Sequence, residues 1–279
     1  MLMDHITKSL IELALAEDIG RGDCTTDFVV SPDTQARGTV WIKQSARIAG
    51  LPLLAAVFHM VDPNLDIVTM FTDGQDVVEK AAVCTVQGSA QSILRAERTA
   101  LNFLSRLCGI ATVTRYAVSM VEGTPVKLLD TRKTTPGWRS IEKYAVTMGG
   151  GHNHRYGLDD MILIKDNHIA VAGGVAQAIE RAKAKVALSQ KIEVEVDTLE
   201  QFDIALDAGV DVILLDNMTT DTLRKAVLRN NSRVLLEASG NMTLQRLAEV
   251  AETGVNYISM GALTHSATGV DVGLDVAIL

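Results

Sequence analysis

The sequence predicts an α/β protein built in two parts. Residues 1–108 mix helical and extended segments without a regular repeat, whereas residues 109–279 alternate short apolar segments with helical ones. The last four apolar segments begin about 20 residues apart, a spacing that is typical of βα units with short loops. We therefore expect a mixed α/β domain over residues 1–108 and a domain resembling an α/β barrel over residues 109–279.

In the first part, an amphipathic helix is predicted over residues 5–17, because apolar side chains recur there at helical spacing. A long helix is predicted over residues 89–107, which contain neither Pro nor Gly. Between the two helices, extended segments are predicted at residues 38–43, 65–70 and 82–86.

The second part contains six short apolar segments with few polar residues, as expected for strands of a parallel sheet that is covered on both faces. A barrel and an open doubly wound sheet produce the same periodicity, and the polar strand ends described below favour the barrel. The six predicted strands cover residues 126–129, 161–164, 192–196, 212–215, 234–236 and 257–260.

The chain is acidic overall, with 26 Lys and Arg against 34 Asp and Glu and a formal net charge of −8. Cationic and imidazole side chains nevertheless gather in three short motifs between Asp130 and His168. A local cationic cluster in an acidic chain indicates a pocket for a small, multiply anionic ligand. A nucleic-acid-binding protein would be expected to show a broad basic surface instead.

The three cysteines, Cys24, Cys84 and Cys108, are widely spaced and form no CxxC pair, which is typical of reduced cysteines. No apolar run approaches the roughly 20 residues that are needed to cross a bilayer. Charged residues interrupt the first segment, where a signal peptide would be apolar. We therefore expect a cytoplasmic protein.

Polar, reactive or glycine residues follow each of the six predicted strands. One such strand end would be explained by capping alone, but six of them favour a shared pocket, because the carboxyl ends of barrel strands form the active face. The strand-end residues are Asp130-Thr131-Arg132-Lys133, Lys165-Asp166-Asn167-His168, Glu195 with Asp197, Asp216-Asn217, Glu237 to Asn241, and Ser259-Met260-Gly261.

Two of these strand ends have the composition of phosphate-binding loops. Ser239-Gly240-Asn241 precedes a predicted helix, and Ser259-Met260-Gly261 precedes a turn that leads to His265. Glycine lets backbone amides approach an anion, and the start of a helix adds partial positive charge. Ordinary turn glycines are the alternative for either loop, whereas the consecutive pair favours phosphate binding.

Arg132, Lys133, Arg155 and Lys165 suit a ligand that carries carboxylate or phosphate groups. Exposure to solvent is the alternative for any Arg or Lys. For Lys165 a position in the pocket is favoured over exposure to solvent, because this residue directly follows an apolar strand.

Glu195 and Asp216 end predicted strands that follow one another. Paired carboxylates opposite cationic groups suit Mg²⁺ bound to a diphosphate, or the stabilisation of a cationic sugar transition state. Ion pairs with the same Arg and Lys residues are the alternative. A zinc site at His152-x-His154 lacks a third ligand at a recognisable spacing.

Several motifs together resemble the quinolinate phosphoribosyltransferase family. The resemblance covers nearly the whole chain in the expected order, and the runs TRKTTP and GGGHNHR are its most specific parts. The matching residues are 16–26, 97–102 (ERTALN), 130–136 (DTRKTTP), 149–155 (GGGHNHR), 164–168 (IKDNH), 193–195, 215–217 (LDN), 237–240 (EASG) and 259–266 (SMGALTHS).

This resemblance implies an N-terminal mixed α/β domain packed on a C-terminal incomplete α/β barrel of about six parallel strands, and a homodimer in which Arg98 reaches the neighbouring subunit's site. It also implies that quinolinate and phosphoribosyl pyrophosphate become nicotinate mononucleotide, pyrophosphate and CO₂ in NAD biosynthesis. The final residues of the chain would return to the smaller domain.

The resemblance also implies a role for each site residue. Arg98, Thr131, Arg132, His154 and Arg155 would bind quinolinate. Lys133, Lys165, Glu195 and Asp216 would act in catalysis and contact phosphoribosyl pyrophosphate, the two acids also holding Mg²⁺, directly or through water. The other residues implied to bind phosphoribosyl pyrophosphate are Ser239, Gly240, Asn241, Ser259, Met260, Gly261 and His265.

Three alternative functions remain compatible with parts of this pattern. A related phosphoribosyltransferase could act on another small acid, and a phosphate-ligand sensor on the same scaffold would not catalyse a reaction. A barrel aldolase could use Lys165 as a Schiff-base amine. The complete set of carboxylate-binding residues favours quinolinate.

Overall fold

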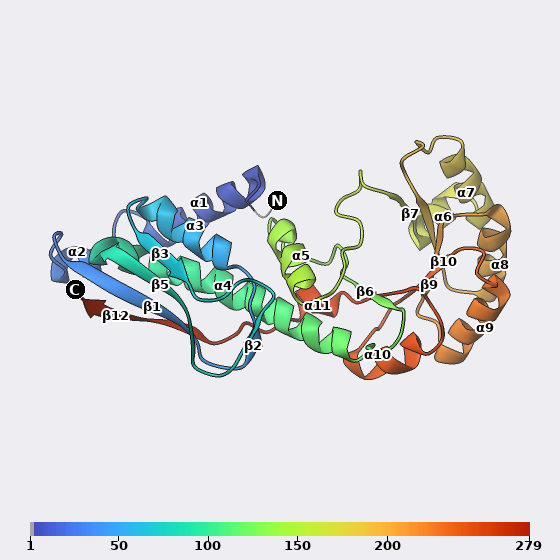
Figure 1. Ribbon diagram of the computed structural model, residues 1–279. Helices are drawn as coiled ribbons and strands as arrows, with labels where there is room; N and C mark the ends of the chain where they lie inside the picture. The colour runs from blue at the N-terminus through green and yellow to red at the C-terminus, as the bar shows by residue number, and fades with distance from the viewer. Residues whose placement is uncertain (1–2) are drawn as a thin grey trace. The chain divides into compact units, whose positions relative to one another are not determined.

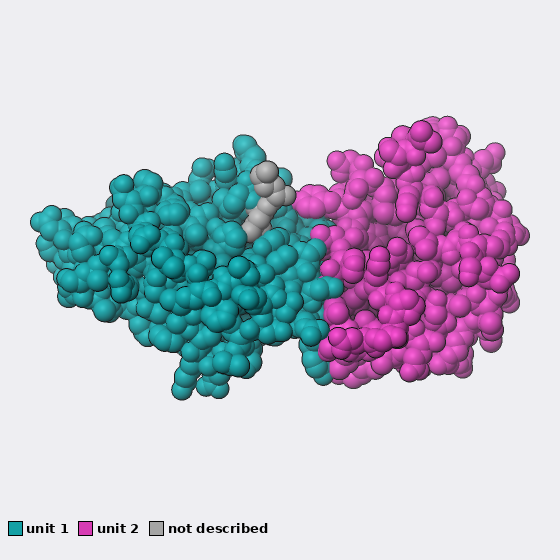
Figure 2. Space-filling view, in the orientation of Figure 1, with its two compact units in different colours: residues 1–116, 134–150, 263–279 teal, residues 117–133, 151–262 magenta. Residues whose placement is uncertain are grey.

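The computed structural model describes residues 3–279 and divides the chain into two compact units (Figures 1 and 2). The first unit comprises residues 1–116, 134–150 and 263–279, and the second comprises residues 117–133 and 151–262. The boundary predicted after residue 108 falls inside helix α4 (Ala90–Ser119). Along residues 3–279 no helix is both long and apolar enough to cross a membrane.

The first unit contains a four-stranded antiparallel sheet in the order β12-β1-β5-β3 (Figure 1). Burial alternates along β1, because one face of the sheet packs on the core of the unit and the other is more exposed. Three of these strands lie where the extended segments were predicted, and the fourth is the C-terminal strand. Their bounds are β1 Gln35–Ile42, β3 Asp66–Thr69, β5 Ala81–Ser89 and β12 Val272–Ile278.

Capping interactions fix where the early helices begin. Asp4 caps the first helix by accepting a hydrogen bond from the Thr7 backbone amide at 2.7 Å. The Asp73 carboxylate accepts the amides of Gly50 and Leu51 at the start of α3. The elements not yet named are α1 His5–Ile19, α2 Cys24–Val29, α3 Leu51–Val61, and the paired short strands β2 Ala46–Arg47 and β4 Asp76–Val77.

A buried ion pair joins three separate segments of the first unit. Glu142, on α5 (Arg139–Met148), is fully buried and pairs with Arg106 of α4 at 2.9 Å. Arg106 also donates to the backbone carbonyls of Thr264 and Ala267, near α11 (Ala262–His265). A buried charge needs such partners. These contacts explain why residues 134–150 and 263–279 belong to this unit.

The second unit is built on a six-stranded parallel sheet in the order β6-β11-β10-β9-β8-β7. The strands occur where six were predicted, and helices follow them as in βα units (Figure 1). The strands are β6 Lys127–Leu129, β7 Ile162–Ile164, β8 Ile192–Val196, β9 Val212–Asp216, β10 Leu235–Ser239 and β11 Tyr257–Ser259. The helices are α6 Asp166–Ala172, α7 Val175–Lys183, α8 Leu199–Ala208, α9 Thr220–Asn230 and α10 Leu244–Ala251.

The sheet is not a closed barrel. Its edge strands, β6 and β7, form no pairing with each other in the described residues. The segment that contains His152 lies along the β6 edge instead: the His152 amide donates to the Leu128 carbonyl at 2.8 Å, and the Asp130 amide donates to the His152 carbonyl at 3.0 Å. The predicted incomplete barrel of parallel strands is thereby confirmed.

Side chains alternate between the two faces of the sheet. On β8, Val194 and Val196 are buried in the core, whereas Glu193 and Glu195 point to the opposite face. Leu214 and Asp216 of the neighbouring β9 share the face of these acids, since they line the same cavity as Glu195. One face therefore packs on the helices, and the other is free to carry polar groups.

Candidate active site

All six strand ends of the second unit contribute to one cavity of about 550 Å³, called here the strand-end cavity. A single cavity can be lined by every strand end because the carboxyl ends of parallel strands meet at the same edge of the sheet. The sequence-predicted residues that line it are Thr131, Arg132, Lys133, His154, Arg155, Lys165, Glu195, Asp216, Ser239, Gly240, Asn241 and Ser259. Residues that line it without having been predicted to bind a ligand are Leu163, Leu214, Asn217 and Glu237.

The cationic side chains of the cavity are positioned by local backbone contacts. The Thr131 hydroxyl accepts the Lys133 amide at 3.0 Å, and Arg155 donates through Nη1 to the Met161 carbonyl at 3.2 Å. Burial lowers the pKa of Arg155, and the charge of Arg132 lowers it further. Two guanidinium groups that repel each other in a half-buried site make an anionic ligand favourable there.

The acidic side chains lie on neighbouring strands. Lys165 Nζ pairs with Glu195 Oε2 at 2.6 Å, so the ion pair considered from the sequence is present. Burial raises the pKa of Asp216, and the charge of Glu195 raises it further, while Lys165 and Asn217 act in the opposite direction. The two carboxylates are therefore close enough to interact. Their oxygen donors fit the ligand preference of Mg²⁺.

The loop after β10 has backbone conformations that suit an anion cradle. Gly240 has φ +84° and Asn241 has φ +46°, two consecutive residues in the left-handed region. A Cβ atom at position 240 would lie 2.3 Å from Asn217 Oδ1 and 2.6 Å from its backbone nitrogen. Asn241 Nδ2 donates to the same Asn217 oxygen at 2.9 Å. Only glycine fits this position, because Asn217 occupies the space of a side chain.

The second predicted phosphate loop, Ser259-Met260-Gly261, contributes only its serine to the cavity. Ser259 lines the strand-end cavity, but Met260 is buried and its amide donates to the Leu129 carbonyl at 2.9 Å. This amide therefore belongs to the sheet and is not available to a ligand. Gly261 follows Met260 and does not line the cavity formed by the described residues.

Two predicted site residues belong to the first unit. Arg98 is exposed on α4, and His265 is exposed at the end of α11, where its Nδ1 lies 2.7 Å from the Ser266 hydroxyl. Their roles toward a ligand remain predictions.

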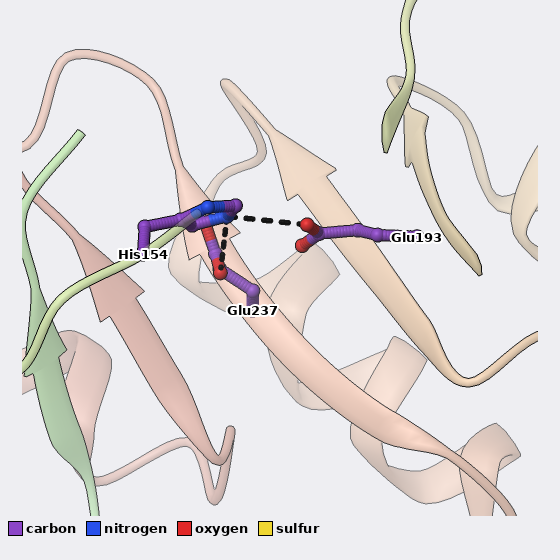
Figure 3. A group of neighbouring side chains, drawn as sticks. All are labelled: His154, Glu193 and Glu237. Atoms are coloured by element: carbon purple, nitrogen blue, oxygen red, sulfur yellow. Dashed lines mark ion pairs between the residues drawn. The ribbon is translucent and has the colours of Figure 1, made fainter. Parts of the chain in front are cut away.

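A buried cluster lies beside the cavity and is formed by His154, Glu193 and Glu237 (Figure 3). His154 Nε2 lies 3.1 Å from Glu193 Oε2 and 3.4 Å from Glu237 Oε2. The Arg155 backbone amide donates to His154 Nδ1 at 2.7 Å. The strand alternation that places Glu193 on the face of Glu195 was the available sequence signal for this cluster. Glu237 was predicted among the strand-end residues of the shared pocket, but neither glutamate was predicted to bind a ligand.

Burial and charge act against each other in this cluster. Burial lowers the pKa of His154, but hydrogen bonds to Glu193 and Glu237 outweigh it and raise the value to about 10. Burial raises the pKa of Glu193, although the contact with His154 opposes that shift. The raised pKa favours a charged imidazole, whereas the Arg155 amide donates to Nδ1 and favours the neutral ring. The short Nδ1 contact decides for the neutral ring, because a proton on Nδ1 would point at the amide hydrogen, so the ring proton is on Nε2 and faces the glutamates.

Comparisons with known proteins match both parts of the chain. Residues 23–108 match the model of the quinolinate phosphoribosyl transferase N-terminal domain, and residues 110–275 match that of the C-terminal domain. The chain belongs to the quinolinate phosphoribosyl transferase family.

Relatives and solved structures extend over nearly the full chain. A probable nicotinate-nucleotide pyrophosphorylase (carboxylating) from Bacillus subtilis is 40% identical over 277 residues, which cover 99% of this chain and 96% of the relative. The crystal structure of NadC from Streptococcus pyogenes matches with a TM-score of 0.94 at 37% identity, covering 98% of this chain and 96% of that one. The nicotinate-nucleotide pyrophosphorylase from Francisella tularensis matches with a TM-score of 0.93 at 39% identity and the same coverage.

The family assignment agrees with the motifs that the cavity brings together. Residues of the TRKTTP, GGGHNHR and EASG runs are separated by up to about 100 positions in the sequence, yet they line one cavity. The quinolinate phosphoribosyl transferase resemblance seen in the sequence is confirmed at the level of the family and of the fold.

Proposed function

We propose that this chain is a quinolinate phosphoribosyltransferase, an enzyme of NAD biosynthesis. It converts quinolinate and phosphoribosyl pyrophosphate to nicotinate mononucleotide, pyrophosphate and CO₂. The observation that supports this most directly is the strand-end cavity, where paired guanidinium groups, paired carboxylates and a glycine cradle meet. Family membership and similarity over nearly the full chain support the same reaction.

In this proposal the two carboxylates of quinolinate bind at the cationic wall. Arg132 and Arg155 provide the charge and Thr131 a hydroxyl, with His154 beside Arg155. Guanidinium groups bind carboxylates through two parallel hydrogen bonds, which fixes the pyridine ring as well as attracting it. Arg98 completes this set from the neighbouring subunit of a homodimer.

The phosphoribosyl donor occupies the other side of the cavity. Amides of the loop Ser239-Gly240-Asn241 hold the 5-phosphate, and Gly240 provides the left-handed turn of this backbone. Ser259, Gly261 and His265 complete this end, and Met260 supports it from the sheet, since its own amide is already bonded to Leu129.

Lys133, Lys165, Glu195 and Asp216 act near the bond that breaks. The two acids would hold Mg²⁺, directly or through water, and this ion would neutralise the diphosphate as it departs. Lys133 and Lys165, the latter paired with Glu195, contact the sugar diphosphate or lie between the two substrates. Glu195 and Asp216 stabilise the positive charge that develops at the anomeric carbon.

The chemistry then needs positioning more than acid–base catalysis. The pyridine nitrogen attacks the anomeric carbon as pyrophosphate leaves, and the ring becomes cationic. The carboxylate beside that nitrogen departs as CO₂, and the electron pair left on the ring carbon is stabilised by the cationic nitrogen before it takes up a proton. The reduced state of Cys24, Cys84 and Cys108 fits a cytoplasmic location for this reaction.

A coupled incubation tests the reaction. The purified chain is mixed with quinolinate labelled in the carboxylate beside the nitrogen, phosphoribosyl pyrophosphate and Mg²⁺, and we expect labelled CO₂ and nicotinate mononucleotide in equal amounts. Nicotinate in place of quinolinate should give no nucleotide. Turnover of nicotinate would identify a different phosphoribosyltransferase, and binding without turnover would identify a sensor. Borohydride trapping of a carbonyl substrate on Lys165 would identify an aldolase.

A further inference from the structure

Glu193 and Glu237 are more deeply buried than Glu195 and Asp216. Only 1% of Glu193 and 2% of Glu237 is exposed, and they come from β8 and β10, which are separated by β9 in the sheet. Buried carboxyl groups are costly unless they are paired or hydrogen-bonded. His154 is the polar group that both of them face (Figure 3).

The cluster separates two cavities of the second unit. His154 and Glu237 line the strand-end cavity and also a second cavity of about 320 Å³, which Glu193, Lys127 and Lys191 line as well. Lys127 and Lys191 lie at or just before the amino ends of β6 and β8. The imidazole and the two glutamates thus lie between the proposed substrate site and the second cavity.

His154 lies in a segment that the sheet holds along one edge only. The segment from residue 151 to residue 155 pairs with the β6 edge at His152, and the His154 amide donates to Asp130 Oδ1 at 2.9 Å. Across the sheet, Glu193 and Glu237 contact this segment through the His154 ring. The ring in turn accepts the amide of Arg155, which has its side chain in the strand-end cavity.

We infer that Glu193 and Glu237 are positioning residues: their two carboxyl groups hold the Nε2–H of His154 across the sheet, and the ring thereby fixes the backbone and guanidinium of Arg155 for the substrate's carboxylates. This inference rests on the proposed function and deepens it. His154 acts through Arg155, because both of its ring nitrogens are used within the protein. Either glutamate alone can accept the single Nε2–H, so the pair is redundant for this contact.

The same three groups have the composition of a metal site, since their ligand atoms all lie within 4.8 Å of one another. The 3.1 Å between Nε2 and Glu193 Oε2 fits a hydrogen bond and fits two ligands of one metal ion equally well. Metal analysis of the purified enzyme is therefore part of the test.

Because either glutamate can hold His154, single and double substitutions are expected to have different effects on quinolinate binding. Glu193→Leu and Glu237→Leu each leave one carboxylate to accept the Nε2–H of His154, and we expect KM for quinolinate to change by less than about threefold in either. The double variant leaves no acceptor, and we expect KM for quinolinate to rise roughly tenfold or more, with kcat and KM for phosphoribosyl pyrophosphate nearly unchanged. Glu200→Leu, at an exposed acid on α8, controls for the same substitution elsewhere.

Two outcomes of this series would overturn the inference. One is an unchanged KM for quinolinate in a folded double variant. The other is an equal loss of affinity for both substrates, which indicates a general structural role. Quinolinate binding is also measured by calorimetry, which does not depend on catalysis. The inference can therefore fail while the proposed function holds. The proposed function fails if the unmodified chain does not convert quinolinate.

A measurement on the unmodified protein covers the case in which the double variant does not fold. Nitrogen-15 NMR of the histidine rings is expected to show His154 with its proton on Nε2 and an unprotonated Nδ1. A proton on Nδ1 overturns the inference, whether or not Nε2 is also protonated, because the ring then no longer accepts the Arg155 amide. A bound transition metal at one per chain, with Nε2 as its ligand, overturns it as well.

Discussion

At the scale of single residues, the strand-end cavity holds side chains of like charge close together. Burial and then the charge of Arg132 lower the pKa of Arg155, and burial and then the charge of Glu195 raise that of Asp216. An anion between the two arginines and a cation between the two acids would relieve both effects. Like charges held together without a ligand are typical of a binding site, because folding alone gains nothing from their proximity.

Gly240→Ala is predicted to impair binding of the phosphoribosyl donor. The added Cβ would overlap Asn217, which holds Asn241, so the cradle must open. We expect kcat/KM for phosphoribosyl pyrophosphate to fall by about two orders of magnitude, while calorimetric affinity for quinolinate alone stays within about threefold.

Gly123→Ala is the matched control for this substitution. Gly123 has φ +83°, nearly the value of Gly240, but a Cβ there would meet no atom within 4 Å. Both variants therefore carry a similar cost from the left-handed backbone, of about 1 kcal/mol. Equal losses of activity in the two variants would show that backbone strain, and not the Asn217 contact, explains the effect.

At the scale of elements, much of the second unit could be predicted because its signals are local. Apolar runs located the six strands, and polar residues after them identified the cavity lining. The buried glutamates were harder to assign, because an acid within a strand looks the same in sequence whether it faces a helix or a cavity. For Glu193, the alternation with Glu195 along the strand indicates that both side chains face the cavity. For Glu237, the face could be assigned only once the pairing register of β10 was known.

The first unit shows where local signals fail. The long helix predicted to end at residue 107 continues to Ser119, through Gly109. Glycine there serves a contact distant in sequence: a Cβ at this position would lie 2.1 Å from the Thr268 carbonyl oxygen. The same limitation applies to β12, whose partner β1 lies more than 200 residues earlier in the chain. Such pairings depend on tertiary packing.

Deletion of residues 272–279 is predicted to destabilise the first unit. β1 pairs with β12 from Ala36 to Ile42, and without β12 these backbone groups would form an exposed edge. We expect Tm to fall by about 5 °C or more and light scattering to reveal association through the edge. Removal of Leu279 alone, which lies beyond the strand and contributes one hydrogen bond from its amide to the Gln35 carbonyl, is the control. A truncated chain with unchanged Tm would contradict the importance of this pairing.

At the scale of the whole molecule, the chain crosses between its two units several times. Residues 117–133 and 151–262 build the strand-end cavity, while residues 134–150 and 263–279 join the first unit through contacts such as Arg106 with Glu142. Cutting the chain after residue 108 would therefore remove segments that the first unit needs. Arg98 also belongs to this unit, and its proposed contribution to a neighbouring subunit makes assembly a condition of activity.

Mixing two inactive variants tests that contribution. If Arg98 acts across subunits, Arg98→Ala and Lys165→Ala are each inactive alone. A mixed dimer, however, contains one site with Lys165 from one chain and Arg98 from the other, both unmodified. Random exchange should therefore restore about a quarter of the activity per chain, since half of the dimers are mixed and each has one intact site. If Arg98 acts within its own chain, every site in the mixture lacks one group and no activity returns. Mixing each variant with itself under the same exchange conditions provides the baseline.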